Sequence, residues 1–393
     1  MVLTTRQEEG LKEICSRCKT GDKYVVIGGY AGTGKSTLVK VAIDALNVNP
    51  EDVAYATFTG KAAEVLRKKG NPGAITLHKL LYDHFPKPTG GYIRVPKKVL
   101  DKKVVVVDEV SMVPKDMIDL LLKHRAFVIF LGDPFQLPQI DKSQSHDLLD
   151  KPHVFLDEVM RQEAESEIIR LTMDIRAMKP IDYCKGEEVM VMRKEEMVDS
   201  CLTWADQVIV ATNAQRRRYN DRMRQMYGFS GLPQEGEKII SLRNFWDDFS
   251  TNGDPLVNGL TGIIHNPTEG VIELPRYLKL NKKEIPVIYC DFEVDEGSIF
   301  LGTPMDKNLI EKGEPFLDYR ENYKLRMIKS KVGDLLPRDY DFGYAITAHK
   351  SQGSEFDKVL VLEEQFPFDK VEHARWLYTA CTRASEKLVL VRS

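Results

Sequence analysis

The 393-residue sequence has little of what marks a membrane protein or a secreted, disulfide-linked protein. Its longest apolar runs, Val104–Val107 and Phe127–Leu131, have the length of a strand, and the first residues contain no apolar signal segment. The six cysteines are scattered, and the C-x-x-C pair of Cys15 and Cys18 has no second pair nearby, which favours packing on a helix over zinc or redox chemistry. We therefore expect a soluble, cytoplasmic protein without a membrane partner.

A surplus of positive charge is also lacking, because 56 Lys and Arg residues are matched by 59 Asp and Glu residues, for a net charge of −3. This balance excludes a general positive field that would attract nucleic acid. Any nucleic acid has to bind in a local groove. The length suffices for two or three domains with a sizeable core.

The most informative stretch is the glycine-rich Gly29–Ser36, which matches the phosphate-loop pattern G-x-x-x-x-G-K-[ST]. The β-branched run Tyr24–Ile27 precedes it and an apolar-periodic stretch follows, which predicts a strand, a turn and a helix. Backbone N–H groups of such a turn bind oligophosphate, with Lys35 at the β- and γ-phosphates and the Ser36 hydroxyl on magnesium. An incidental glycine turn is one alternative. A dinucleotide-binding turn is another, but it fits poorly because Thr37 stands where glycine or alanine is required.

Two further predicted strands end in polar side chains. Val104–Val107 leads into Asp108 and Glu109, and this pattern predicts that Asp108 holds magnesium and Glu109 polarises the attacking water. The alternative, two acids that merely face solvent, is disfavoured by the phosphate loop upstream. Phe127–Leu131 leads into a rigid turn whose Gln136 is placed to sense the γ-phosphate.

The alternation of predicted strands and helices indicates an α/β fold. Residues 1–155 form a nucleotide-binding domain with a Pro- and Gly-rich hairpin inserted at 85–102, and residues 156–235 with 340–393 repeat the type without a phosphate loop. Residues 236–339 are rich in short β runs and predict a small β-barrel insertion. The predicted runs there are Lys238–Leu242, Gly262–His265, Gly270–Leu274 and Ile285–Cys290.

Taken in order, these stretches resemble the motifs of superfamily 1 DNA helicases, in the RecD-like branch with 5′→3′ polarity that includes the phage Dda helicases. The resemblance covers nearly the whole chain. It implies two RecA-like P-loop NTPase domains, with a strand-separating hairpin in the first and an SH3-like barrel in the second. The stretches that carry it are Gly29–Thr37, Thr57–Ala63, Thr76–His78, Asp108–Met112, Gly132–Pro138, Leu156–Gln162, Asn258–Gly259, Ala345–Gly353 and Leu377–Arg383.

The resemblance also implies roles for single residues. Gln7 would read the adenine edge, although the residue alone favours a solvated glutamine, and Arg161 and Arg383 would reach the γ-phosphate from the second RecA-like domain. His78 would contact DNA, although taken alone it is better explained as a core or surface residue. The remaining nucleotide contacts fall on Gly29, Ala31, Gly32, Thr33, Gly34, Lys35, Ser36, Thr37 and Gly353, with the metal on Ser36 and Asp108. The remaining DNA contacts fall on Thr59, Lys61, Tyr92, Pro138, Thr347, His349 and Lys350.

The implied function is that of an ATP- and Mg²⁺-dependent DNA helicase that moves along single-stranded DNA and separates duplexes. Single-stranded and forked DNA are the expected partners, single-strand-binding or replication proteins are further candidates, and a monomer in a bacterial or phage-infected cell is expected. One alternative is a translocase that strips proteins from DNA and unwinds little. The other is a small-molecule kinase, which would not need a second motif-bearing domain with two arginines.

Overall fold

The computed structural model describes residues 3–86, 92–138, 142–160, 165–274, 282–294, 297–327, 336–364 and 369–392. The chain divides into two compact units. Unit 1 contains Met1–Leu81, Lys97–Thr212 and Ile346–Ser393, and unit 2 contains Tyr82–Pro96 and Asn213–Ala345. In the part of the chain that is described, no helix is both long and apolar enough to cross a bilayer.

Unit 1 contains a six-stranded parallel sheet in the order β3-β2-β6-β7-β1-β8. Its central strands are β-branched and buried on both faces, as parallel strands between two helical layers must be. The strands are β1 (Tyr24–Gly29), β2 (Val53–Thr57), β3 (Ile75–Thr76), β6 (Val104–Val107), β7 (Phe127–Gly132) and β8 (Val154–Leu156).

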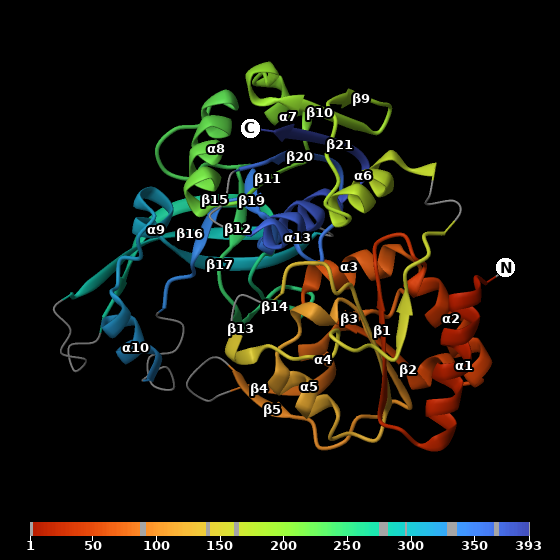
Figure 1. Cartoon of the computed structure of the whole chain (residues 1–393). Coiled ribbons are helices and arrows are strands. Elements are labelled where there is room, and N and C mark those ends of the chain that lie inside the picture. The colour runs from red at the N-terminus through yellow and green to blue at the C-terminus, as the bar shows by residue number, and fades with distance from the viewer. Residues whose placement is uncertain are drawn as a thin grey trace. The chain divides into compact units, whose positions relative to one another are not determined.

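Helices cover both faces of this first sheet (Figure 1). Alternate residues of β1, β6 and β7 pack with Ile14 of α1 and Leu38 of α2 in one core, while α4 and α5 lie on the other side. Cys18 packs at the margin of that core, in line with the packing role predicted for it. The helical segments are α1 (Thr5–Thr20), α2 (Lys35–Leu46), η1 (Pro50–Asp52), α3 (Gly60–Lys68), α4 (Leu77–Leu81), η2 (Val110–Met112), α5 (Lys115–Leu121) and η3 (Lys142–Gln144).

Unit 1 also contains a second six-stranded sheet, in the order β19-β11-β20-β21-β10-β9. Its pairs β11–β20, β20–β21 and β21–β10 are parallel, and the short edge strand β9 is antiparallel to β10. The strands are β9 (Cys184–Lys185), β10 (Val189–Arg193), β11 (Gln207–Val210), β19 (Ala345–Thr347), β20 (Phe356–Leu362) and β21 (Ala384–Arg392).

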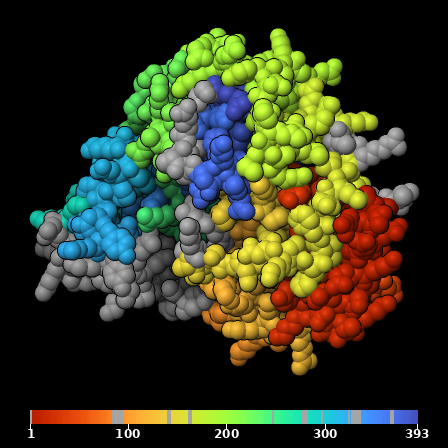
Figure 2. Space-filling model, in the orientation of Figure 1, coloured from red at the N-terminus to blue at the C-terminus, as the bar shows by residue number. Residues whose placement is uncertain are grey.

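Two helices, α6 and α13, pack against each other and against this second sheet. In the space-filling view, atoms of the blue C-terminal stretch border the yellow-green segment that contains α6 (Figure 2). The two parallel sheets confirm the predicted α/β class. The helical segments are α6 (Glu167–Arg176), η5 (Lys194–Glu196), α7 (Ser200–Trp204), α12 (Ala348–Ser351) and α13 (Lys370–Cys381).

Unit 2 is built mainly from antiparallel strands. Its sheet has the order β17-β16-β15-β12-β18, and an isolated bridge from Met305 to Arg338 links β17 to the residues just before β18. The hairpin of β4 and β5 belongs to the same unit. The strands are β4 (Tyr82–Pro86), β5 (Tyr92–Pro96), β12 (Lys238–Ser241), β13 (Phe245–Phe249), β14 (Pro255–Leu256), β15 (Thr261–Glu273), β16 (Glu284–Val294), β17 (Ser298–Asp306) and β18 (Tyr340–Phe342), and the helices are α8 (Asn213–Met226), α9 (Lys307–Lys312) and α10 (Tyr319–Met327).

The predicted short runs Gly262–His265 and Gly270–Leu274 are wrong as separate strands, because the single strand β15 contains the first run and all of the second except Leu274. Its pairing with β16 shifts register between His265 and Thr268, and Asn266 there has a φ of 52°. A bulge therefore absorbs the residues that read as a break in the sequence.

A buried polar network fixes the residues that lead into β19. Arg216 of α8 donates to Asp341 over 2.6 Å, and the Asn220 amide donates to the carbonyl oxygens of Phe342 at 2.8 Å and Ala345 at 3.2 Å. The backbone N–H of Ala345 donates back to Asn220 over 2.7 Å. The Asn220 bonds thus hold the backbone of the turn between β18 and β19 against α8.

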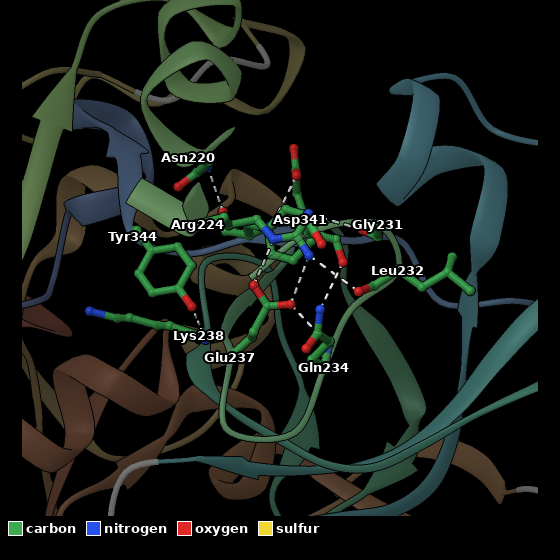
Figure 3. Close-up of polar contacts among 11 residues, drawn as sticks. Asn220, Arg224, Gly231, Leu232, Gln234, Glu237, Lys238, Asp341 and Tyr344 are labelled. Atoms are coloured by element: carbon green, nitrogen blue, oxygen red, sulfur yellow. Dashed lines mark hydrogen bonds and ion pairs between the residues drawn. The ribbon is translucent and has the colours of Figure 1, made fainter. Parts of the chain in front are cut away.

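A second group of contacts joins α8 to the residues just before β12 (Figure 3). Arg224 donates to both carboxylate oxygens of Glu237, at 2.6 and 2.9 Å, and to the carbonyl oxygens of Gly231 and Leu232. Glu237 also accepts from the Gln234 backbone N–H at 2.8 Å. All three guanidinium nitrogens of Arg224 and both carboxylate oxygens of Glu237 thus have partners inside the protein.

The predicted division into 1–155, 156–235 with 340–393, and 236–339 stays a prediction. The compact units instead group the two parallel sheets together and put α8 and the β4–β5 hairpin with the antiparallel strands.

Candidate active site

The phosphate-loop sequence forms the turn between β1 and α2. Gly32 and Gly34 have φ angles of 72° and 74°, in the left-handed region that favours glycine, and Gly34 caps α2. A Cβ atom on Gly34 would lie 2.5 Å from Gln7 Nε2. The turn therefore needs glycine at this position both for its backbone conformation and for the close approach of α1.

The side chains of the turn are turned inward. Lys35 Nζ donates to the carbonyl oxygens of Gly29 at 2.7 Å and Tyr30 at 2.9 Å, and the Thr33 hydroxyl donates to Tyr30 O at 2.8 Å. The ammonium group lies at the carboxyl edge of the sheet, where the ends of three adjacent strands, β6, β7 and β1, meet.

Asp108 and Glu109 follow β6 at this edge. The backbone N–H of Glu109 donates to Asp108 Oδ1 over 2.8 Å, and Glu109 has a φ of 52°, an uncommon backbone conformation for a non-glycine residue. Burial, together with the charge of Glu109, raises the pKa of Asp108 to about 6, while Lys35 and Lys69 act in the opposite direction. A cation at this edge would relieve the crowding of the two carboxylates.

The loop after β7 brings Asp133 and Gln136 to the same edge. Asp133 accepts from the Phe135 backbone N–H at 2.9 Å, and its burial raises the pKa of its carboxyl group, against the opposing charge of Lys35. Gln136 is buried, and its Oε1 atom has no hydrogen-bond partner among the described residues. A buried amide oxygen without a partner is costly unless a ligand or water completes it.

Arg383 lies between α13 and β21, next to the second sheet of unit 1. Its guanidinium group is buried and donates to the carbonyl oxygens of Thr379 at 3.1 Å and Ser354 at 3.1 Å, and to the Thr382 hydroxyl at 3.1 Å. Gly353 lies nearby with a φ of 72°. A Cβ atom there would be 3.1 Å from Thr59 Oγ1, so glycine permits the close approach of this segment to α3.

One cavity of about 410 Å³ joins these groups. Its volume suits a small-molecule ligand, and its lining supplies a glycine-rich turn with a lysine, two carboxylates, the Gln136 amide and an arginine. A nucleoside triphosphate fits this set, because its phosphates would meet N–H groups and cations on every side. The lining residues include Tyr30, Ala31, Gly32, Thr33, Gly34, Lys35, Ser36, Thr37, Asp108, Glu109, Asp133, Gln136, Gly353, Thr382 and Arg383.

Few protein side chains at this cavity could bind a metal ion. No group of three or more His, Cys, Asp or Glu side chains able to hold a metal ion occurs in the described ranges. The Ser36 hydroxyl and the Asp108 carboxylate, both at the cavity, fit magnesium that shares its remaining ligands with phosphate oxygens and water.

The expectation of a solvated Gln7 is wrong. The side chain is 1% exposed, because its Oε1 atom accepts from Thr4 N at 3.0 Å in a capping box and its Nε2 atom donates to Thr33 O at 3.4 Å. Gln7 thus links α1 to the phosphate loop through its hydrogen bond to Thr33 O. Its implied contact with adenine stays a prediction, as does the role of Arg161, which lies outside the described residues.

The residues assigned to DNA in the first sheet differ in exposure. Thr59 is buried and caps α3 by accepting from Ala62 N, and His78 is 4% exposed with its ring 5.7 Å from that of Phe58. These positions favour the packing role considered for His78. Lys61 forms an ion pair with Glu64 at 3.5 Å.

The other assigned residues lie outside this region or closer to solvent. Pro138 is exposed, Thr347 is buried at the start of α12, and His349 and Lys350 on α12 are partly exposed. Burial lowers the pKa of His349, so its ring is neutral near pH 7. Tyr92 lies in β5, but its side chain is outside the described residues. The DNA contacts of all these residues stay predictions.

Two families of known proteins match the chain. A model described as an AAA domain matches residues 2–198, half of the chain, and a model of the UvrD-like helicase C-terminal domain matches residues 342–391. The chain belongs to the AAA domain family, among the superfamily 1 helicases of the RecD and Pif1 type.

Two named relatives agree with this family. The ATP-dependent RecD2 DNA helicase of Deinococcus radiodurans is 25% identical over 387 residues, which are 93% of this chain and 46% of that protein. The ATP-dependent DNA helicase dda of phage T4 is 28% identical over 150 residues, 36% of this chain and 34% of its own length. The chain thus spans less than half of the RecD2 sequence.

The fold is shared with a solved helicase. The crystal structure of Pif1 helicase from Candida albicans covers 100% of this chain and 95% of its own, with a TM-score of 0.51 and 20% identity. This chain therefore shares the α/β fold of that structure. Asp133 and Tyr378 lie inside the stretches Gly132–Pro138 and Leu377–Arg383, but the sequence does not single them out, because the hydrogen bond that joins them connects residues 245 positions apart.

Proposed function

We propose that the chain is an ATP-dependent DNA helicase that moves along single-stranded DNA in the 5′→3′ direction and separates duplex DNA at a fork. The observation that carries the proposal is the cavity that residues of both parallel sheets line together. Lys35 and Arg383 bring positive charge to it from different sheets. Hydrolysis then depends on how the two sheets meet.

The chain's own residues supply the chemistry of hydrolysis. Lys35 exchanges its bonds to loop carbonyls for phosphate oxygens, Glu109 polarises the attacking water and Gln136 orients it with its unpaired amide oxygen. Arg383, with Arg161, stabilises the charge that develops on the transferred phosphoryl group. Magnesium on Ser36 and Asp108 would neutralise charge on the β- and γ-phosphates.

DNA would be bound across both sheets. Lys61 and Pro138 from the first and His349 and Lys350 from the second are the candidates with some exposure. Contacts to the sugar-phosphate backbone predict little base specificity and strong salt dependence. Unit 2 would add the β4–β5 hairpin as a wedge, and its five-stranded sheet, bridged at Met305, would form the SH3-like barrel.

Names of relatives support the choice of substrate. RecD2 and dda carry the name DNA helicase, and one structural neighbour with a TM-score of 0.52 is described as unwinding forked DNA through two coordinating Pif1 helicases. We propose a monomer as the active form here, in the cytoplasm of a bacterial or phage-infected cell, with single-strand-binding or replication proteins as further partners.

The test uses the purified chain with and without oligothymidylate and with two partial duplexes, one carrying a 5′ tail and one a 3′ tail. We expect ATP hydrolysis to rise with oligothymidylate, strand separation to need ATP and the 5′ tail, and Lys35→Ala to abolish both. Hydrolysis that does not respond to oligothymidylate would contradict the proposal, and preference for the 3′ tail would contradict the direction.

A translocase that displaces bound proteins is the second candidate, because the predicted wedge hairpin is short. It would remove streptavidin from a biotinylated oligonucleotide while it leaves the forked duplex intact.

A further inference from the structure

A tyrosine on α13 contacts the phosphate loop and takes no part in the hydrolysis described above. Tyr378 is 1% exposed, and its hydroxyl oxygen accepts from the Ala31 backbone N–H at 2.9 Å. The same hydroxyl donates to Asp133 Oδ2 over 2.6 Å. One phenol oxygen therefore joins the loop after β1, the loop after β7 and a helix of the second sheet.

This pair of hydrogen bonds is chemically strong. Burial raises the pKa of Tyr378 well above its ordinary value, so the phenol stays protonated and acts as a donor near neutral pH. A short O–H···O bond to a carboxylate is charge-assisted, and a chain from N–H through O–H to carboxylate polarises each bond along it. Asp133 itself is 2% exposed, so water does not compete for the bond.

The loop that follows Asp133 is anchored to the second sheet at a second place. The Leu137 N–H donates to the Thr379 hydroxyl at 3.0 Å, and Leu137 O accepts from Gln352 Nε2 at 2.6 Å. The Phe135 ring packs edge-on against the Tyr378 ring, with centroids 5.3 Å apart. Gln136 thus stands between two anchor points, at Asp133 and at Leu137.

The two anchors differ in what they reach. The Thr379 hydroxyl and the Gln352 amide contact the loop after β7 at the backbone of Leu137, whereas Tyr378 binds that loop and the phosphate loop with one atom. A shift of the phosphate loop at Ala31 is therefore transmitted through the phenol to Asp133 and on to Gln136. Rotation of α13 would break both bonds at once.

We propose that Tyr378 is a positioning residue for ATP hydrolysis, whose hydroxyl holds Gln136 in register with the phosphate loop through Asp133 and Ala31. This inference rests on the proposed function and adds the residue that aligns its two loops. Loss of the hydroxyl frees the Ala31 N–H but removes no bond made by Lys35, whose ammonium group donates to Gly29 O and Tyr30 O. The effect should therefore fall on turnover and spare ATP binding.

The test compares Tyr378→Phe with the wild-type chain and with Tyr340→Phe. The control removes another buried phenol, whose oxygen lies 3.4 Å from Thr303 Oγ1 in unit 2. In Tyr378→Phe we expect kcat of the oligothymidylate-stimulated ATPase to fall by about tenfold or more, since small misplacements near reacting groups have effects of this size. The KM for ATP should stay within about twofold, and the melting temperature should match that of the control.

A double-mutant cycle tests the bond from its other side. Asp133→Asn keeps the shape of the side chain and removes the charge that the phenol binds, so it remains informative even if Tyr378→Phe does not fold. We expect Asp133→Asn to lower kcat, and the double variant to be no slower than the slower single variant, because the two residues act as one bond.

Several outcomes would overturn the inference. These are an unchanged kcat in Tyr378→Phe, a loss confined to the KM for ATP, a loss equal to that of Tyr340→Phe, or effects of the two substitutions that multiply. If wild-type hydrolysis itself ignores oligothymidylate, the proposed function fails first. If instead the wild-type enzyme responds to oligothymidylate and the Tyr378→Phe variant hydrolyses ATP equally fast, the proposed function stands and only the role of Tyr378 is contradicted.

Discussion

Asp108 is the residue at which activity and stability have opposite requirements. Magnesium needs the carboxylate ionised, yet burial and Glu109 raise its pKa from 3.8 to about 6. Because the pKa of Asp108 is higher in the folded state than in the unfolded state, the folded state binds the proton more tightly. Protonated Asp108 therefore stabilises the fold below about pH 4, and this contribution is lost as the pH rises through about 6. Without a cation, the two ionised carboxylates repel each other, and a bound cation would reduce this repulsion.

This conflict predicts the pH dependence of hydrolysis. At limiting magnesium, we expect turnover to fall as pH drops through about 6, because protons then compete with the metal for Asp108. Raising the magnesium concentration should move this acid limb to lower pH. The measurement is the steady-state ATPase rate between pH 5 and 8 at two magnesium concentrations, and an acid limb that does not move would contradict the assignment of Asp108.

Single residues were predictable where the signal is local. The phosphate loop, Asp108 and Glu109 were found from spacing, because a strand end and a turn fix where their side chains go. The burial of Gln7 and the contacts of Tyr378 were not predicted, because they depend on residues up to 347 positions away in the chain. A pattern within one segment carries no information on such contacts.

At the scale of elements, strands buried on both faces were predicted well. β6 has the residues Val104–Val107 that its β-branched run indicated, and β7 (Phe127–Gly132) contains the whole predicted run Phe127–Leu131. The antiparallel strands of unit 2 were predicted less well, because a bulge in β15 looks in the sequence like a loop. Their register is set by pairing partners, which a single strand does not reveal.

The buried ion pair between α8 and Glu237, just before β12, predicts a large effect on stability. Glu237 is 0% exposed, and Glu237→Gln would leave the Arg224 guanidinium buried without its counter-charge. We expect a loss of about 3 kcal/mol in the free energy of unfolding, a typical cost for a buried charge that has lost its partner. Denaturant unfolding followed by circular dichroism measures it.

A matched control is available in the same unit. Glu269 forms an exposed ion pair with Lys307, so Glu269→Gln should leave unfolding nearly unchanged. Equal effects of the two substitutions would show that the Arg224–Glu237 pair adds nothing through its burial.

At the scale of the whole molecule, strand separation should be separable from ATP hydrolysis. Phe85 on the β4–β5 hairpin is 53% exposed and available to stack on a base pair, while the nucleotide cavity is lined entirely by residues of unit 1. Deletion of 89–94, or Phe85→Ala, should therefore weaken unwinding of a forked duplex several-fold and leave DNA-stimulated ATPase intact. A strand-displacement assay beside a coupled ATPase assay measures both.

The control for Phe85→Ala is Val99→Ala, which truncates another exposed apolar side chain outside the two hairpin strands. Normal fork unwinding by both hairpin variants would refute the wedge. A parallel loss of ATPase would place the hairpin in the hydrolytic cycle instead.

The position of β21 has a consequence for biosynthesis. The first sheet has all its strands once residue 156 has been made, but β21, at 384–392, lies between β20 and β10 in the second sheet. At roughly 5–20 residues per second, a ribosome leaves tens of seconds between these points. During that interval the nascent chain carries a finished first sheet beside strands that still lack their central neighbour, and this is when it most needs a chaperone.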